Sequence, residues 1–293
     1  MFYRRKILLG LMQLIGGEVE KLRLQKLLFL YSKKKKDSEY DFIPYKYGCY
    51  SYSASADLSA LSRKEIINES DNSYFKEDNI DYLKLLKPQD KTYLEEVVES
   101  YGKMSKNSLI VHTYINFPFY ATKSVIAKNV LNDTLYQRVI DATPNETETI
   151  LFTIGYEGVS LEKYLSKLVS NNIHVLVDVR KNPLSMKFGF SKTLLKRYCE
   201  SLNVQYIHVP NVGIESNKRK KLNNQIDYDD LFEDYKLTTL KSNIESQEEI
   251  LRILDKYKRI ALTCFEANIC QCHRLHLSES LKNINPTLKV RHI

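Results

Sequence analysis

The sequence predicts an α/β protein. We expect a C-terminal domain with a mainly parallel sheet and helices on both faces, preceded by a mostly helical, winged-helix-like N-terminal domain. After residue 148, short apolar runs alternate with segments of helical periodicity, which is typical of a parallel sheet covered on both sides. Before residue 143, helical periodicity dominates. A length of 293 residues with 43% hydrophobic residues is enough for two domains with ordinary cores.

The N-terminal elements are predicted from hydrophobic periodicity and from the residues that interrupt it. Gly16 and Gly17 separate two helices, and Pro44 and Gly48 break an aromatic stretch that favours irregular or short β structure. A polar turn at 68–72, between two apolar pairs, indicates a small β-wing. The expected elements are helices at 2–15, 18–32 and 54–64, the irregular segment at 41–52, the wing at 66–75, and further helices at 91–101, 106–115 and 124–131.

The domain boundary is predicted at 141–147, which is polar and has no periodicity, so the expected domains are 1–143 and 148–293. Beyond it, each short β-prone run is followed by an amphipathic segment. The expected strands are 150–154, 173–179, 205–209, 259–263 and 288–293, and the expected helices are 160–170, 191–201, 227–240, 245–256 and 272–281.

The loop at 264–274 has the densest group of reactive side chains in the sequence. It follows a predicted strand and precedes a predicted helix, which is where open α/β sheets bind ligands. The first N–H groups of the helix also favour an anion or a polarised oxygen. Packing alone does not require three thiols, a carboxylate, an imidazole and a guanidinium in one loop. We therefore expect a functional site there that includes Glu266, Cys272, His273 and Arg274.

Two other interpretations of the cysteines stay open. Thiolate and imidazole are usual zinc ligands, so Cys264, Cys270, Cys272 and His273 are a possible metal set. Their spacing, Cys-x5-Cys-x-Cys-His, lacks Cys-x2-Cys arms and matches no standard zinc motif. Cys264 alone is also typical of a small hydrophobe at the end of a buried strand. We expect no resident metal and no cofactor.

Several short motifs follow one another through the C-terminal half. They are TIGYEG at 153–158, VDVRKNPLS at 177–185, GFS at 189–191, YIHVP at 206–210, Cys264-x-Glu266 and Cys272-His273-Arg274. In this order they resemble a widespread bacterial family known only as domain of unknown function 488. The resemblance implies the fold class and the site, but no particular reaction. The family usually has a Gly-Gly pair after its His-x-Pro segment, where this chain has Val212 and Gly213.

A second resemblance concerns the N-terminal part. The segment 24–29 (LQKLLF), together with Tyr47 and Gly48, is similar to small helical domains found in toxin–antitoxin and phage-related proteins. It implies regulation or macromolecular recognition. The neighbouring tyrosines Tyr45, Tyr50 and Tyr52 are also compatible with packing a small core.

Residues from several predicted strand ends are expected to converge, because loops after parallel strands share one edge of the sheet. Carboxylates in unlike environments can divide acid and base roles. Asp178 and Arg180 have the alternative of pairing as a structural salt bridge, since they lie two apart on one side of a strand. The expected catalytic residues are Glu157, Asp178, Glu266, Cys272 and His273, and the expected substrate-binding residues are Tyr156, Arg180, Asn182, Ser185, His208 and Arg274.

The net charge of +8 lies mainly in the C-terminal half. Of 44 Lys/Arg and 36 Asp/Glu, 22 and 20 precede residue 149, which leaves 22 and 16 after it. Basic patches beside a site attract polyanions, of which nucleic acid is the commonest, although a lysine-rich surface can also be merely solvated. The expected DNA-binding residues are Lys187, Lys192, Lys196, Arg197, Lys218, Arg219, Lys220 and Lys221.

These features predict a bacterial, cytoplasmic enzyme that acts on nucleic acid. The favoured reaction is N-glycosidic hydrolysis, as by a DNA glycosylase or nucleotide hydrolase that processes modified or damaged bases in DNA repair or antiviral (phage) defence. The alternatives are a cysteine-dependent, rhodanese-like transferase and a non-enzymatic DNA-binding regulator with a ligand-sensing domain. DNA is the expected partner. No apolar run approaches the roughly 20 residues that span a bilayer, so a membrane is not an expected partner. The sequence does not indicate an oligomeric state.

Overall fold

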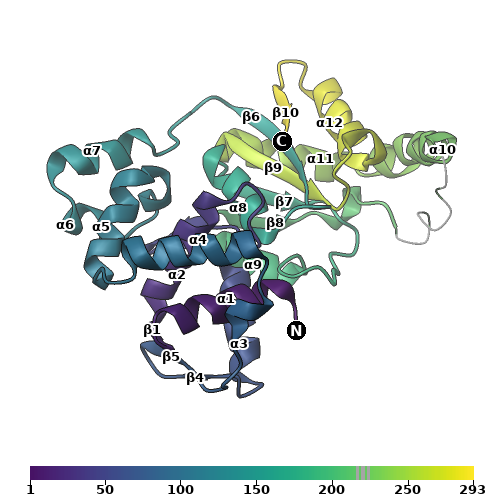
Figure 1. Cartoon of the computed structure of the whole chain (residues 1–293). Coiled ribbons are helices and arrows are strands. Elements are labelled where there is room, and N and C mark those ends of the chain that lie inside the picture. Colours follow the sequence, from purple (N-terminus) through teal and green to yellow (C-terminus); the bar gives the residue numbers. More distant parts are fainter. Residues whose placement is uncertain (216–217, 219–221, 223–224) are drawn as a thin grey trace. The chain divides into compact units, whose positions relative to one another are not determined.

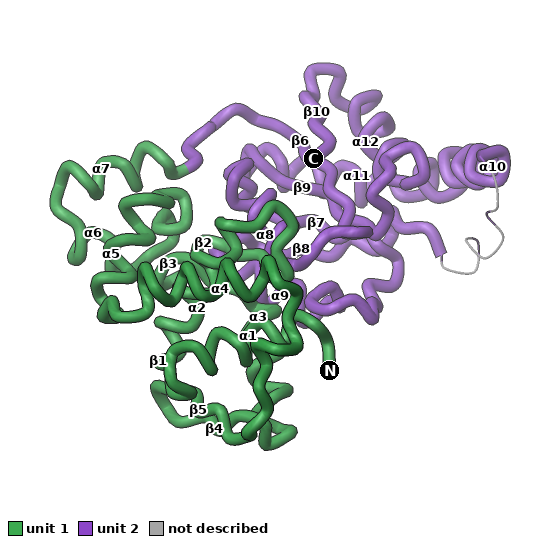
Figure 2. The backbone as a smooth tube through the Cα atoms, viewed as in Figure 1, with its two compact units in different colours: residues 1–143 green, residues 144–293 purple. Residues whose placement is uncertain are grey.

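The computed structural model describes residues 1–215, 218, 222 and 225–293. Contacts between Cα atoms divide the chain into two compact units, Met1–Thr143 and Pro144–Ile293 (Figure 2). The polar segment 141–147 contains this division. In the part of the chain that the structure describes, no helix is both long and apolar enough to cross a membrane.

The N-terminal unit is mostly helical, and its core is formed by α1, α2, α3 and α4 (Figure 1). The helices are α1 (Tyr3–Leu14), α2 (Lys21–Lys34), α3 (Tyr52–Ser62), α4 (Pro88–Tyr101), α5 (Lys106–Asn116), α6 (Ala127–Val130) and α7 (Asp133–Asp141), with the shorter turns η1 (Tyr82–Leu85) and η2 (Pro118–Ala121). Helix α7 was not expected from the sequence. Asn132 caps it by accepting a hydrogen bond from the backbone N–H of Leu135 at 2.9 Å.

Short antiparallel strands complete this unit. Strands β1 (Glu18–Glu20), β5 (Ser73–Lys76) and β4 (Ile67–Glu69) form a sheet in the order β1-β5-β4, and β2 (Ile43–Tyr45) pairs with β3 (Gly48–Tyr50). The hairpin β4–β5 forms where the wing was expected. The prediction of helix from residue 18 was wrong for its first turn, because Glu18–Glu20 pairs with β5. Whether the unit works as a winged helix stays a prediction.

The C-terminal unit contains an all-parallel sheet, as the alternating pattern predicted. Its strands are β6 (Ile150–Gly155), β7 (Val175–Asp178), β8 (Gln205–His208), β9 (Arg259–Cys264) and β10 (Val290–His292), in the order β10-β6-β9-β7-β8. The connecting helices are α8 (Leu161–Ser170), α9 (Lys192–Glu200), α10 (Gln225–Tyr235), its continuation η5 (Lys236–Leu240), α11 (Ile244–Tyr257) and α12 (His273–Ile284), with the short turns η3 (Pro210–Val212) and η6 (Ile269–Gln271). The α/β fold class is therefore confirmed.

Helices cover both faces of this sheet. Ile260 and Leu262 of β9 belong to a buried cluster that includes side chains of α11 and α12. The hydroxyl of Tyr164, from α8, donates to Thr263 Oγ1 at 2.7 Å. Because adjacent residues of a strand point to opposite faces, α8 lies on the face opposite α11 and α12.

Strand β9 is the strand that positions the site. It lies in the middle of the sheet between β6 and β7, and all six of its residues are buried. The helix after it, α12, does not begin until His273. The intervening residues 265–272 therefore cross the carboxyl edge of the sheet next to the ends of both neighbouring strands.

Candidate functional site

The register of the sheet brings the ends of four strands into one row. Gly155 of β6 is paired with Cys264 of β9, and Asp178 of β7 is paired with Thr263 on one side and His208 on the other. The ends of these strands, the loops after them and the start of α12 contain the expected catalytic and substrate-binding residues. The residues expected to converge thus share one edge of the sheet.

A pocket of about 260 Å³ opens at this edge. Four of the expected residues lie in its wall together with Cys264, and they supply a phenol, a guanidinium, an amide and a hydroxyl. Lys181, Leu184, Ile214 and Phe265 also line it and were not expected, although three of them are sequence neighbours of residues that were. The described lining is Tyr156, Arg180, Lys181, Asn182, Leu184, Ser185, Ile214, Cys264 and Phe265.

Asp178 and Arg180 form a buried ion pair. Arg180 Nε lies 2.8 Å from Asp178 Oδ1, and Arg180 Nη2 lies 2.5 Å from Oδ2. The backbone N–H of Arg180 and the hydroxyl of Tyr206 donate to the same carboxylate. Asp178 is fully buried. The geometry is that of the structural salt bridge, and it leaves Asp178 poorly arranged to exchange protons with a substrate.

The ion pair also orients the rest of the guanidinium. Arg180 Nη1 donates to the hydroxyl of Tyr156 at 2.8 Å and to the carbonyl of Phe190 at 2.9 Å. The rings of Tyr156 and Phe190 are stacked with centroids 4.3 Å apart. Burial alone would lower the pKa of Arg180, but its hydrogen bonds to Asp178 raise that pKa overall, so the guanidinium stays charged.

His208, expected to bind substrate, supports the pocket from behind. Lys192 Nζ lies 3.0 Å from His208 Nδ1, so Nδ1 accepts and Nε2–H donates to the carbonyl of Arg180 at 2.9 Å. His208 is not among the described residues that line the pocket. Its contacts fix the backbone at Arg180.

The two remaining expected carboxylates differ in their surroundings. Glu157 is exposed, and its Oε2 accepts a hydrogen bond from the backbone N–H of Ala267 at 3.0 Å. Glu266 is half-buried, and its Oε2 lies 3.1 Å from both Cys264 Sγ and Cys272 Sγ. Because Cys264 lines the pocket, the Glu266 carboxylate adjoins the pocket wall.

Four side chains from the end of β9, the following loop and the start of α12 form a compact cluster. One ligand-type atom from each of Cys264, Glu266, Cys272 and His273 lies within 4.8 Å of the other three. His273 Nδ1 lies 3.6 Å from Cys264 Sγ and 4.0 Å from Cys272 Sγ. Burial raises the pKa of the Cys272 thiol well above its ordinary value. This set of donors can hold a metal ion, and Cys270, which is exposed, does not belong to it.

Arg274, expected to bind substrate, lies behind this cluster. Its guanidinium is 1% exposed, so a substrate in the pocket does not reach it. Arg274 Nε donates to Cys272 Sγ at 3.1 Å, and Nη2 donates to the backbone carbonyl of Glu266 at 2.6 Å. Arg274 therefore connects Glu266, near the start of the loop, to Cys272 at its end.

Two glycines allow the loops to approach the sheet. A Cβ at Gly155 would lie 2.0 Å from the carbonyl oxygen of Glu266, and a Cβ at Gly213 would lie 2.4 Å from the backbone nitrogen of Lys181. Neither backbone atom can move cheaply. Gly213 therefore provides a close approach to the backbone that follows β7.

The residues expected to bind DNA are only partly available. Lys187 Nζ donates to the backbone carbonyl of Tyr156, and burial lowers the pKa of Lys187. Lys196 lies 3.8 Å from Glu200, and Lys218 lies 2.6 Å from Asp234. Lys192 and Arg197 are exposed, and Lys192 also contacts His208. Arg219, Lys220 and Lys221 lie outside the described residues.

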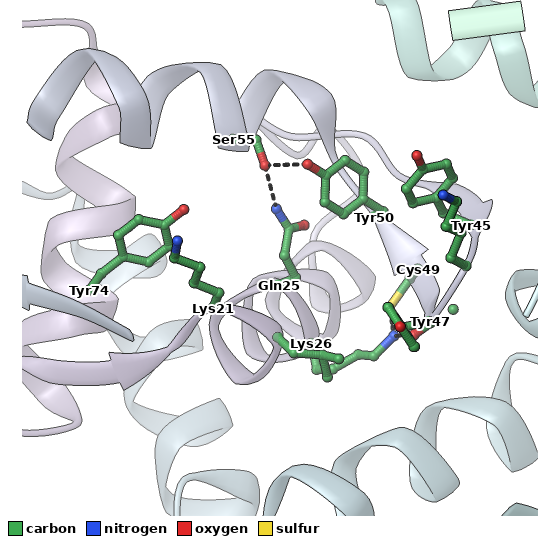
Figure 3. Close-up of a pocket in the computed structure, with 12 residues that line it drawn as sticks. Lys21, Gln25, Lys26, Tyr45, Tyr47, Cys49, Tyr50, Ser55 and Tyr74 are labelled. Atoms are coloured by element: carbon green, nitrogen blue, oxygen red, sulfur yellow. Dashed lines mark hydrogen bonds between the residues drawn. The ribbon is translucent and has the colours of Figure 1, made fainter. Parts of the chain in front are cut away.

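The N-terminal unit has a separate pocket of about 320 Å³, and four of the twelve residues that line it are tyrosines (Figure 3). Tyr50 and Ser55 share a hydrogen bond of 2.7 Å, and Gln25 Nε2 donates to Ser55 at 3.3 Å. Lys26 is 1% exposed and donates to the carbonyl of Tyr47 at 2.5 Å. This contact joins the two segments that carry the N-terminal resemblance, 24–29 and 47–48.

We expect Asp178→Asn to lower the free energy of unfolding of the C-terminal unit by about 3 to 5 kcal/mol, because it leaves the buried Arg180 without its counter-charge. Glu157→Gln, on the exposed carboxylate, is the matched control and should change it by less than about 0.5 kcal/mol. Urea unfolding of the full chain, followed by circular dichroism, measures both. A loss below about 1 kcal/mol for Asp178→Asn would contradict the importance of the ion pair.

Comparison with known proteins finds a similarity to a family of unknown function. No curated protein matches the chain. Residues 160–281 match the model of the family described as "Domain of unknown function DUF488", a stretch that runs from the start of α8 to near the end of α12 and includes the ion pair and the four-residue cluster. Residues 160–281 of the C-terminal unit are therefore similar to the DUF488 family, as the motifs indicated.

Proposed function

We propose that the C-terminal unit is a DNA glycosylase-like hydrolase that binds one nucleotide unit in the edge pocket and cleaves its N-glycosidic bond, in DNA repair or phage defence. The observation that supports this is the composition of the pocket wall. Asn182 and Ser185 provide hydrogen-bonding groups beside the ring of Phe265, which is 44% exposed, and Arg180 and Tyr156 form the buried side of the wall. Guanidinium and amide groups recognise base edges, and aromatic rings stack on bases.

The size of the pocket also favours a small ligand. A volume of about 260 Å³ is slightly below the range of roughly 300 to 1,000 Å³ that is common for ligand pockets. Such a space suits a single base with part of its sugar better than a dinucleotide or an extended peptide. An enzyme with such a pocket acts on a base in duplex DNA only after extruding it from the stack.

Exposed apolar side chains at the pocket rim support this extrusion. Leu184 and Met186 are 85% and 104% exposed, and Leu184 also lines the pocket. Apolar side chains that insert between base steps unstack them and stabilise a distorted duplex. The exposed cations Lys192 and Arg197 follow in the same part of the chain and are suited to phosphate contacts.

The chemistry assigned to the site is hydrolysis. The oxygen of a water molecule forms a bond to the anomeric carbon C1′, the C1′–N bond breaks, and the base leaves with its bonding electrons. A carboxylate takes the proton from water, and donors in the pocket stabilise the departing base. Glu266, which adjoins the wall, and Glu157, which anchors the same loop, are the assigned carboxylates. Asp178 is a positioning residue that orients Arg180.

In this proposal the N-terminal unit does not make the main contacts with DNA. Helix α3 follows the hairpin β2–β3 and precedes the wing, yet its sequence, Tyr52–Ser62, contains no Lys or Arg. Its one acidic residue, Asp57, accepts hydrogen bonds from Arg4 and Arg5. Affinity for DNA depends on cations that neutralise phosphates, so we assign the main DNA contacts to the C-terminal unit.

A cysteine-dependent transferase is the second candidate, because Cys264 stands at the end of β9 and lines the pocket. A nucleophilic thiol at a strand end, with an imidazole nearby, is the arrangement that such chemistry uses. The third candidate is a ligand-responsive regulator, and the observation favouring it is the aromatic pocket in the N-terminal unit.

The full-length protein should form abasic sites in modified or unmodified phage DNA, scored by alkaline cleavage. Removing a general base typically lowers a rate by about 100- to 10,000-fold, so Glu266→Gln or Glu157→Gln should show a loss of that size. Cys270→Ser, in the same loop but exposed, should keep the wild-type rate. Absence of abasic sites on every DNA, with substrate-protected alkylation of Cys264 by iodoacetamide, would favour the transferase instead.

The rim residues should matter for duplex DNA in particular. Leu184→Ala with Met186→Ala should slow the reaction on duplex DNA by about tenfold or more, since unstacking a base costs a few kcal/mol, and should spare single-stranded DNA. Leu237→Ala removes an apolar side chain of η5 that is 69% exposed, and it serves as the control. Equal losses on both substrates would argue against wedge insertion.

DNA binding should weaken steeply with salt. For about five neutralised phosphates, the slope of log K against log salt concentration is roughly −4 to −5. Lys192→Ala and Arg197→Ala should each make this slope shallower by about one, whereas the paired Lys196 should have less effect. Fluorescence anisotropy with a labelled duplex at several salt concentrations measures the slopes. A flat salt dependence would identify the cations as ordinary solvated surface.

A further inference from the structure

We propose that Cys264, Glu266, Cys272 and His273 bind one zinc ion at the carboxyl edge of the sheet. This inference goes beyond the proposed reaction, because it rests on the geometry of the loop and is tested by metal content. It also reverses the expectation drawn from the spacing of the cysteines. The spacing of the cysteines suggested Cys270 as the fourth donor. In the structure, the carboxylate of Glu266 lies beside the other three donors and Cys270 is exposed.

The distances fit a tetrahedral ion. Zinc lies about 2.3 Å from sulfur and about 2.0 to 2.2 Å from nitrogen or oxygen, so neighbouring donors in a tetrahedron are roughly 3.3 to 3.8 Å apart. Here the distances from the two sulfurs to Glu266 Oε2 and His273 Nδ1 run from 3.1 Å, between Oε2 and either sulfur, to 4.0 Å, between Cys272 Sγ and Nδ1. All four donors lie within 4.8 Å of one another, so movements of up to about 1 Å would give the coordination geometry.

His273 is oriented as a metal ligand. Its Nε2 lies 3.2 Å from the backbone carbonyl of Val179, a group that only accepts, so Nε2 carries a proton. In the neutral ring Nδ1 then has the lone pair, and Nδ1 is the atom that faces the two sulfurs. Histidines that bind metals almost always donate their other ring N–H to such a partner. His273 is fully buried, which fixes this orientation.

Arg274 supplies an outer contact to the cluster. Its Nε donates to Cys272 Sγ at 3.1 Å, and a hydrogen bond of this kind stabilises a coordinated thiolate. The charges also balance. One Zn²⁺ with two thiolates and one carboxylate has a net charge of −1, which the buried guanidinium of Arg274 offsets. The site is therefore neutral as a whole, as a buried group of charges should be.

The donor set favours zinc over other common ions. Ca²⁺ and Mg²⁺ prefer oxygen ligands, of which this cluster has one side chain. Two thiolates, an imidazole and a carboxylate suit a borderline-soft ion with tetrahedral preference. Because Cys264 and Glu266 adjoin the pocket, exchange of the Glu266 carboxylate for water would leave three protein ligands, which is the arrangement of catalytic zinc sites. The carboxylate released in this way would then be free to act as the base of the proposed reaction.

The experiment measures metal in the full-length protein purified without chelator and refilled with zinc. Plasma mass spectrometry should give one zinc per chain for the wild type and for Cys270→Ser. Cys264→Ser and Cys272→Ser should lose more affinity, in competition with a chromophoric chelator, than the roughly 10- to 100-fold expected for an outer-sphere change such as Arg274→Gln. Glu266→Gln should still bind zinc, but more weakly.

A second measurement covers variants that fail to fold. Replacing zinc by Co²⁺ in the wild type should give the visible absorption of tetrahedral cobalt and the near-ultraviolet band of cobalt–thiolate bonds, with both bands unchanged in Cys270→Ser. Wild-type protein that remains substoichiometric after refilling and shows no thiolate band would overturn the proposal. So would a Cys264–Cys272 disulfide in protein handled anaerobically. Neither outcome depends on glycosidase activity, so this proposal and the proposed function can fail separately.

Discussion

The ion pair between Asp178 and Arg180 is the interaction on which the carboxyl edge depends. Asp178 is fully buried, so its charge requires a partner, and Arg180 supplies that partner from two residues further along the same strand end. The remaining guanidinium nitrogen then reaches Tyr156 after β6 and the carbonyl of Phe190. One charged contact thereby fixes the loops that follow two strands. These hydrogen bonds hold the Arg180 side chain in one orientation, and that orientation shapes the pocket wall.

The position of the loop after β9 depends on a close contact between its backbone and the backbone of β6. The carbonyl of Glu266 lies so close to Gly155 that any side chain there would collide with it. Arg274 holds the same carbonyl, and the N–H of Ala267 is held by Glu157. The three contacts fix the direction of the turn, so that the thiols and the carboxylate face inward and Cys270 stays outside. Contacts from Gly155, Arg274 and Glu157 thus set the position of the loop.

Features that depend on residues close together in the sequence were predictable, and features that depend on contacts between distant segments were not. Strands and helices of the C-terminal unit were predictable because their apolar pattern is local, and so was the edge where the motifs meet. The role of His208 was not predictable, since its partners Lys192 and the Arg180 carbonyl are set by strand order. The choice of Glu266 over Cys270 as a fourth donor depends on the path of eight loop residues. Spacing alone does not encode that path.

The three carboxylates at this edge show how one scaffold separates chemical roles. Asp178 has four hydrogen-bond donors around it and is fully buried, which suits a permanent charge. Glu157 is exposed and tethers a backbone N–H, which suits loop anchoring. Glu266 lies between two thiols at the pocket wall, where a bound cation would hold it or a water molecule could replace it. Of the three, Glu266 is the one whose environment changes with what the pocket contains, and the reaction should therefore be most sensitive to it.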